Sequence, residues 1–192
     1  MHGDGGTGEA HRHLGAVVLM APFSRLDGTL HCEGVSLEPL AESVGTPAYV
    51  YSASSIRGQF ERLDRALAPV PHRIHYACKA NSSLGLLGLM RSIGARIDVV
   101  SGGELFRARA AGFAPDDIIF GGVGKSPHEL REAVAAGVHL ISIESEAELR
   151  LLNQVAGEGG AVARIGIRVN PEITVETFHE YIKTGQKGDK FG

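Results

Sequence analysis

Residues 75–81 read HYACKAN, and the fold prediction starts from this stretch. The apolar, β-rich run Arg73–Cys78 predicts a strand, and the Asn-Ser-Ser run that follows favours the start of a helix. Lys79 is therefore expected at the carboxyl end of a strand, where α/β enzymes carry their chemistry. Strand alternation places Lys79 on the same face as His75 and Ala77.

Lys79 has two interpretations. A surface lysine that ends a strand is the ordinary one, because most lysines are solvated. A lysine against an apolar wall instead loses solvation of its charged form, and a neutral amine can attack an aldehyde. The small side chain of Ala77 leaves room beside the lysine stem.

The chain beyond residue 72 alternates regularly between strand and helix patterns. The predicted strands are Arg73–Cys78, Arg96–Val100, Asp117–Phe120, His139–Ile143 and Ala163–Val169. The predicted helices are Ser83–Ile93, Gly102–Ala111, Pro127–Ala136 and Glu146–Val155. Three helices open with S-x-x-E capping boxes, at Ser101 and Glu104, Ser126 and Glu129, and Ser145 and Glu148. This rhythm indicates buried parallel strands, in either a doubly wound sheet or part of a (β/α) barrel.

The amino-terminal part is less regular. Its Gly- and His-rich start predicts a disordered leader. Leu26–Leu30 predicts a hairpin turn, and helical spacing of apolar residues predicts a helix over Ser36–Val44. We expect a strand at Ala48–Tyr51 and a helix at Ser52–Leu67.

The composition excludes several classes of protein. The 192 residues are 43% hydrophobic and 21% charged with a net charge of -3, as in one soluble globular domain. Scattered Lys and Arg argue against nucleic acid, and short apolar runs argue against a membrane span. The sequence has no metal-binding pattern. It also lacks a secretory signal and a disulfide framework, so we expect a cytoplasmic protein in which Cys32 and Cys78 are reduced.

Tyr76–Asn81 resembles the Y-A-x-K-A-N motif of the fold-type III pyridoxal-phosphate enzymes, which include amino-acid decarboxylases and alanine racemase. The resemblance implies that Lys79 carries pyridoxal 5'-phosphate covalently. It also favours the alanine-racemase-like (β/α) barrel, which has eight strands in roughly 250 residues. This chain is then expected to be an amino-terminal portion, truncated after about five βα units.

The same resemblance divides the chain into three regions. Residues 1–22 are the leader, and residues 23–51 are strands and a short helix that pack with a mostly absent β domain. Residues 52–192 are a partial pyridoxal-phosphate-binding barrel. We expect Ala77, Val99 and Ile167 to point into this barrel. The chain alone is expected to be inactive and poorly folded, because the open barrel exposes apolar strand edges.

Residues 96–105 carry two candidate acidic groups. Asp98 lies inside an apolar strand, where a lone charge is costly, so it should have a partner. Glu104 fits both a capping box and an active-site network. The stretch resembles the family's D-V-x-S-x-G-E-L strand, which implies that Asp98 and Glu104 belong to the network around the cofactor lysine.

Alternation over residues 164–169 puts Arg164, Gly166 and Arg168 on one face. An inward arginine at a strand end offers a fixed fork for a phosphate or phenolate oxygen, whereas a surface arginine is the ordinary alternative. The R-V-N-P stretch resembles that of the amino-acid decarboxylases. It implies that Arg168 lies beside the cofactor ring.

The last stretch, from Asn170, resembles the N-P … H-x-Y-I-x-T-G … K-F-G series of the meso-diaminopimelate decarboxylases. The resemblance implies a polar substrate loop with His179 and Tyr181, meso-diaminopimelate as substrate, and a homodimer in the complete enzyme. The implied reaction yields L-lysine and CO2. We expect the loop, residues 170–192, to be mobile over the active-site mouth.

Three alternatives stay open. One is a decarboxylase of the same fold that acts on ornithine, arginine or carboxynorspermidine, and another is a non-enzymatic pyridoxal-phosphate-binding protein. The third is a P-loop nucleotide-binding module, because Gly121–Ser126 reads GGVGKS after a strand. The full P-loop motif requires a glycine where Ile119 stands, so a structural turn is favoured. The turn resembles the Gly- and Lys-Ser-containing turn after the third strand of the pyridoxal-phosphate family, which implies that Lys125 faces the active-site mouth.

Overall fold

The structure is a computed structural model that describes residues 22–171. The predicted leader, apart from Pro22, and the predicted loop with His179 and Tyr181, apart from Asn170 and Pro171, lie outside these residues. The chain divides after Gly58 into two compact units, residues 1–58 and 59–192. The predicted domain boundary between residues 51 and 52 stays a prediction.

The first unit is a small antiparallel sheet with one helix. Its elements are β1 (Phe23–Leu26), β2 (Thr29–Cys32), β3 (Val35–Ser36) and α1 (Leu37–Val44), and the strand order is β1-β2-β3. The predicted hairpin is confirmed, with Leu26 opposite Thr29. Asp27 and Gly28 both have positive φ, 51° and 84°, as a two-residue hairpin turn requires.

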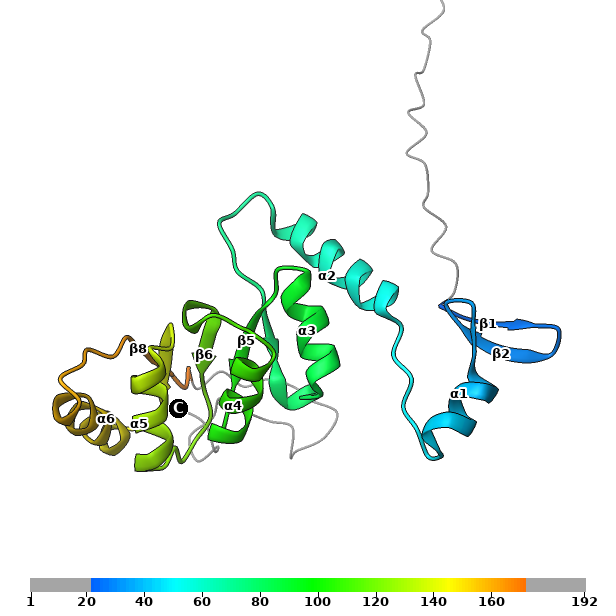
Figure 1. Cartoon of the computed structure of the whole chain (residues 1–192). Helices are drawn as coiled ribbons and strands as arrows, with labels where there is room; N and C mark the ends of the chain where they lie inside the picture. Colours follow the sequence, from blue (N-terminus) through cyan, green and yellow to red (C-terminus); the bar gives the residue numbers. More distant parts are fainter. Residues whose placement is uncertain (1–21, 172–192) are drawn as a thin grey trace, which may run out of the picture. The chain divides into compact units, whose positions relative to one another are not determined.

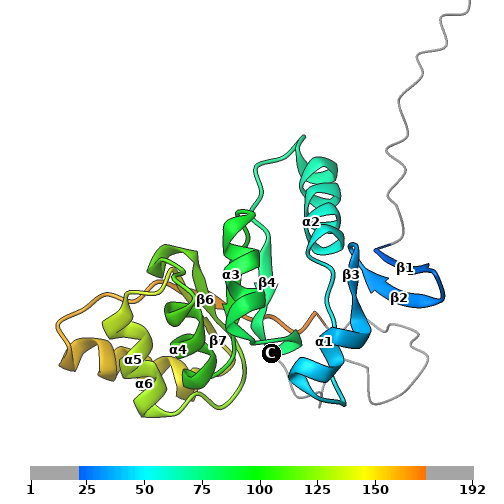
Figure 2. The ribbon, with the colours of Figure 1, turned by 45° about the vertical axis from the view of Figure 1, so that its right-hand side comes forward.

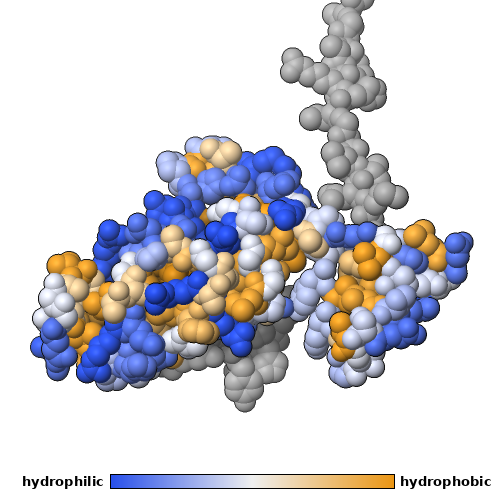
Figure 3. All heavy atoms as spheres, in the orientation of Figure 1, coloured by the Kyte–Doolittle hydropathy of each residue, from blue (hydrophilic) through white to orange (hydrophobic). Residues whose placement is uncertain are grey.

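The segment that leaves this sheet contradicts one prediction. Residues 48–51 form no strand, and Tyr49 is 91% exposed. A strand requires a hydrogen-bonded neighbour, and none of the described strands pairs with this segment. Helix α2 (Ala53–Leu67) follows as predicted. Apolar surface, coloured orange, is visible on the first unit in Figure 3, in keeping with its exposed Phe23 and Val35.

The second unit contains a parallel sheet with helical crossovers. Its strands are β4 (His75–Ala77), β5 (Arg96–Val99), β6 (Ile118–Phe120), β7 (Leu140–Ile143) and β8 (Ile165–Ile167). Its helices are α3 (Leu84–Ser92), α4 (Gly102–Ala110), α5 (Pro127–Ala136) and α6 (Glu146–Glu158), with short 3-10 turns η1 (Cys78–Ala80) and η2 (Pro115–Asp117). Every predicted element of this unit is present, although the strands are shorter than predicted.

The order of these strands decides between the two predicted architectures. The order is β4-β5-β6-β7-β8, so every crossover moves one step in the same direction. Right-handed crossovers then place all the helices on one face of the sheet, as Figures 1 and 2 show for α3 to α6. A doubly wound sheet reverses direction and carries helices on both faces. The fold is therefore a truncated (β/α) barrel, as predicted.

The core lies between the sheet and these helices. Alternate strand residues are fully or almost fully buried on the helix side: Ile97, Val99, Ile118, Phe120, Ile141 and Ile143. The register aligns Ala77 with Asp98 and Asp98 with Ile119, so these three share the barrel-interior face. Val99 therefore faces the helices and not the interior, which contradicts the prediction.

Ile167 was also predicted to point inward, and this is wrong for the same reason. It is aligned with the buried Ile143, so it lies on the helix side of β8. Ile167 is 70% exposed because no helix among residues 22–171 covers this end of the sheet.

None of the described helices is long and apolar enough to cross a membrane.

Candidate active site

The predicted site residues come from four places in the second unit. Lys79 lies in η1, directly after β4, and Asp98 lies in β5. Glu104 lies in the first turn of α4, and Arg168 directly follows β8. Parallel strands end at the same edge of a sheet, so the fold brings these side chains toward one end of the partial barrel.

The stretch around Lys79 departs from the predicted strand. Residue 78 begins a 3-10 turn, which breaks the alternation and buries Cys78 completely while Lys79 is exposed. Burial raises the pKa of the Cys78 thiol to about 11, which makes it inert. The expected apolar wall around Lys79 is therefore not found in the described residues, and its amine is open to a ligand.

Two polar side chains hold this turn. The Tyr76 hydroxyl donates to the Asn81 carbonyl oxygen at 3.0 Å. The Asn81 side-chain oxygen accepts from the backbone N–H of Ser83 at 2.9 Å, one residue before α3 begins. The Y-x-x-x-x-N part of the motif thus fixes the backbone on both sides of Lys79, independently of any ligand.

Asp98 is the electrostatic centre of the predicted site. Burial raises the pKa of this half-buried carboxyl group, and the Glu104 charge raises it further, whereas Lys79 and Arg168 lower it. The charges of the other three predicted residues therefore all affect the pKa of Asp98. The expected partners of the Asp98 carboxylate are the cations Lys79 and Arg168. Gly121 packs against it, because a Cβ at that position would lie 3.1 Å from the Asp98 Oδ1.

Glu104 serves as part of a helix cap. Its Oε2 accepts from the backbone N–H of Val100 at 2.9 Å, and its own N–H donates to Ser101 Oγ at 3.2 Å. The structure thus shows the capping interpretation directly. The network role stays a prediction, and the influence of Glu104 on the pKa of Asp98 is consistent with it.

Of the three predicted capping boxes, only the one at Ser126 and Glu129 is complete. At α4 and α6 the serine accepts from the glutamate N–H, but the glutamate reaches one residue further back. The backbone at Ser101 and Ser145 is extended, with φ of -155° and -159°, compared with -71° at Ser126. At these two caps the glutamate accepts from the backbone N–H of the residue before the serine, and not from the N–H of the serine itself.

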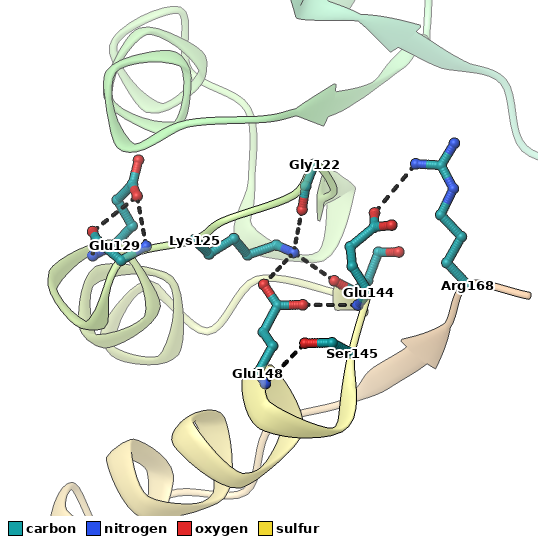
Figure 4. A network of polar contacts seen from close by, with 9 residues as sticks. Gly122, Lys125, Glu129, Glu144, Ser145, Glu148 and Arg168 are labelled. Carbon is teal, nitrogen blue, oxygen red and sulfur yellow. Dashed lines mark hydrogen bonds and ion pairs between the residues drawn. The ribbon is translucent and has the colours of Figure 1, made fainter. Parts of the chain in front are cut away.

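Lys125 does not face the site mouth. Its side chain is 1% exposed, and its Nζ donates to the carbonyl oxygens of Gly122 at 2.7 Å and Ser142 at 2.6 Å and to Glu148 Oε1 at 3.0 Å (Figure 4). These three acceptors use all three ammonium protons, so none remains for a phosphate group. The geometry therefore contradicts the P-loop alternative and makes this lysine structural.

Arg168 is held from the neighbouring strand end. Its backbone N–H donates to the Ile143 carbonyl oxygen at 3.0 Å, and its Nη1 donates to Glu144 Oε1 at 3.2 Å (Figure 4). Sequence reasoning assigned no role to Glu144. The sequence did contain a hint of a role for Glu144. Helix capping explains Ser145 and Glu148, but it gives no reason for a glutamate at position 144.

Other features lie away from these residues. A groove of about 550 Å³ lies between α4 and α5, lined by Leu105, Phe106 and Glu132 among others, on the side of the sheet opposite Asp98. Within residues 22–171, no group of three or more His, Cys, Asp or Glu side chains is placed to hold a metal ion.

Residues 53–192 match the sequence family described as "Pyridoxal-dependent decarboxylase, pyridoxal binding domain". The chain is 46% identical over 173 residues to diaminopimelate decarboxylase of Pseudomonas aeruginosa, which covers 90% of this chain and 41% of that protein. The chain therefore spans about two fifths of this relative's length.

Two solved structures are also similar. Diaminopimelate decarboxylase from Helicobacter pylori, complexed with L-lysine, superposes with a TM-score of 0.76 at 40% identity, over 81% of this chain and 39% of that one. The enzyme from M. jannaschii, also complexed with L-lysine, gives a TM-score of 0.80 at 34% identity, over 88% of this chain and 40% of that one.

Proposed function

Because the chain belongs to the pyridoxal-dependent decarboxylases, with residues 53–192 in their pyridoxal-binding domain, we propose that it serves the decarboxylation of meso-2,6-diaminopimelate to L-lysine and CO2. The similar proteins from Pseudomonas aeruginosa and Helicobacter pylori are named for this substrate, and the latter was solved with L-lysine. The observation that carries the proposal is the placement of Lys79, which is exposed in the turn directly after β4, while Asp98 lies on the neighbouring strand β5 and faces the barrel interior.

The described residues fit pyridoxal phosphate. The exposed Lys79 can reach an aldehyde, and the guanidinium of Arg168, 40% exposed as a side chain, suits an anionic oxygen. When bound, the cofactor supplies a conjugated ring that accepts the electron pair left by the departing carboxylate. Lys79 is the residue to which we assign covalent attachment.

We assign to Asp98, Glu104 and Arg168 the positioning and tuning of the cofactor and of the lysine that carries it. Asp98 offers a carboxylate to the Lys79 ammonium, and its raised pKa means that it holds a proton more readily than a surface aspartate. Glu104 is fixed by the Val100 N–H, and Arg168 by Glu144 and the Ile143 carbonyl oxygen. Substrate contacts by His179 and Tyr181, a homodimer and a cytoplasmic location complete the proposal, on the strength of the sequence resemblance.

A fusion protein tests this function. It joins the chain to the part of the Pseudomonas aeruginosa relative that the chain does not match. The purified fusion protein, loaded with pyridoxal phosphate, is offered meso-diaminopimelate, ornithine, arginine and carboxynorspermidine, and CO2 and amine products are measured. We expect turnover of meso-diaminopimelate alone. Preferential turnover of another substrate, or cofactor binding without any turnover, would reject the proposed reaction.

A further inference from the structure

Glu144 directly follows β7, and Glu148 lies in the first turn of α6, yet the two carboxylates have different surroundings. Glu148 is buried, and both of its carboxylate oxygens are bonded: Oε1 to Lys125 Nζ at 3.0 Å and Oε2 to the Glu144 N–H at 2.8 Å (Figure 4). A buried carboxylate with both oxygens satisfied is what a structural role requires. Glu148 and Lys125 together tie the ends of β6 and β7.

The Glu144 side chain is only 6% exposed, yet its carboxylate is half satisfied. Oε1 accepts from Arg168 Nη1 at 3.2 Å, whereas Oε2 is buried without a hydrogen-bond partner among residues 22–171. An unsatisfied buried oxygen costs free energy and is rare in native proteins, so its presence here requires an explanation.

Helix capping does not account for this carboxylate. Ser145 and Glu148 already cap α6, and the Glu144 backbone N–H is bonded to Glu148. The Glu144 side chain thus turns away from the helix terminus and toward the neighbouring strand end, where it meets Arg168 (Figure 4). Its described contact is with the arginine of the predicted site.

We infer that Glu144 is a positioning residue that holds the Arg168 guanidinium in the orientation in which it meets an anionic oxygen of the bound cofactor. The inference rests on the proposed function. The backbone N–H of Glu144 donates to Glu148, whose carboxylate pairs with the buried Lys125. This buried pair therefore fixes the backbone of Glu144, and the Glu144 side chain in turn holds the arginine after β8. A guanidinium has five N–H donors, and one bond to Glu144 orients it without exhausting them.

A double-mutant cycle tests the inference in the fusion protein. The variants are Glu144→Gln, Glu144→Asp, Arg168→Gln and the Glu144→Gln/Arg168→Gln double variant. Glu146→Gln is the matched control, because Glu146 is an exposed carboxylate two residues away that pairs with Arg150. Each variant is measured for the dissociation constant of pyridoxal phosphate from the apo form, for kcat and KM, and for thermal unfolding.

We expect Arg168→Gln to weaken cofactor binding about tenfold and Glu144→Gln somewhat less, as for directly coupled partners. The double variant should bind no more weakly than Arg168→Gln alone, because Glu144 acts through the arginine. Glu144→Asp, which keeps the charge, should recover part of the affinity. Glu146→Gln should bind like the wild type.

Three results would overturn the inference. They are an unchanged cofactor affinity in Glu144→Gln, additive losses in the double variant, and losses that follow thermal unfolding alone. In each case the wild-type fusion protein still binds cofactor and turns over substrate, so the proposed function stands. A wild-type fusion protein that binds no pyridoxal phosphate would instead overturn both.

Discussion

Lys79 and Lys125 both follow a strand of the parallel sheet, but the two lysines differ in almost every physical respect. Lys125 has a side chain that is 1% exposed and donates to three oxygens, including the carboxylate of Glu148. Lys79 is exposed in a 3-10 turn and lies close enough to Asp98 to alter the pKa of that carboxyl group. A lysine with all its protons bonded is fixed in place, whereas an open lysine beside a carboxylate can react.

The largest expected effect is on turnover. Lys79→Ala should abolish decarboxylation by the fusion protein, because it removes the amine that attaches the cofactor. The free energy of unfolding should change by no more than about 0.5 kcal/mol, because the side chain is exposed. L-lysine production and denaturant unfolding measure the two quantities. Retained turnover, or a large loss of stability, would remove the distinction between the two lysines.

The opposite result is expected for Lys125→Met. It leaves Glu148 buried without its cation, so the free energy of unfolding should fall by about 3–5 kcal/mol. A Lys125→Met/Glu148→Leu double variant should recover much of this loss, because no unpaired charge remains. Urea unfolding of the single and double variants makes the comparison. Equal stability of the wild type and Lys125→Met would show that the buried pair contributes nothing.

A smaller effect is expected at the turn that carries Lys125. Ser126→Ala removes the N-cap of α5 and should cost about 1 kcal/mol of unfolding free energy. Cofactor attachment at Lys79 should not change. Ser43→Ala is the control, because the hydroxyl of Ser43 is exposed and bonds only locally, to the Leu40 carbonyl oxygen. A loss of cofactor equal to the loss of stability would mean that this turn also serves the site.

The smallest expected effect is the pH dependence due to Asp98. Burial raises the pKa of Asp98 above its ordinary value of 3.8, so the native state holds this proton more tightly than the unfolded state. Stability therefore falls as pH rises from 3.8 through the raised pKa, and the deficit persists at neutral pH. Asp98→Asn lacks this penalty, so its stability should increase relative to the wild type over that range. An unchanged difference between pH 3 and pH 7, roughly the ends of an aspartate titration, would contradict the raised pKa.

Much of the fold follows from local sequence patterns. Apolar periodicity and capping serines predict all four crossover helices, and Asp27 and Gly28 predict the first hairpin. The strand at Ala48–Tyr51 is wrong because strand formation depends on a distant pairing partner, which a local pattern does not contain. The direction of the interior face required the register between Ala77 and Asp98, so Val99 was misplaced.

The candidate site also has features that the local sequence predicts and features that depend on contacts between distant residues. A sequence motif identifies Lys79 and its neighbours, but the exposure of Lys79 depends on the 3-10 turn, which strand alternation does not predict. The contacts of Lys125 with Glu148 and of Arg168 with Glu144 join residues that are 23 and 24 positions apart. Such contacts depend on how the strand ends meet in space.

One measurement tests the contrast between the two lysines most directly. The fusion protein is loaded with pyridoxal phosphate, reduced with borohydride and digested, and the modified lysine is located by mass spectrometry. We expect stoichiometric modification at Lys79 and none at Lys125. Modification at Lys125 with Lys79 unmodified would contradict it.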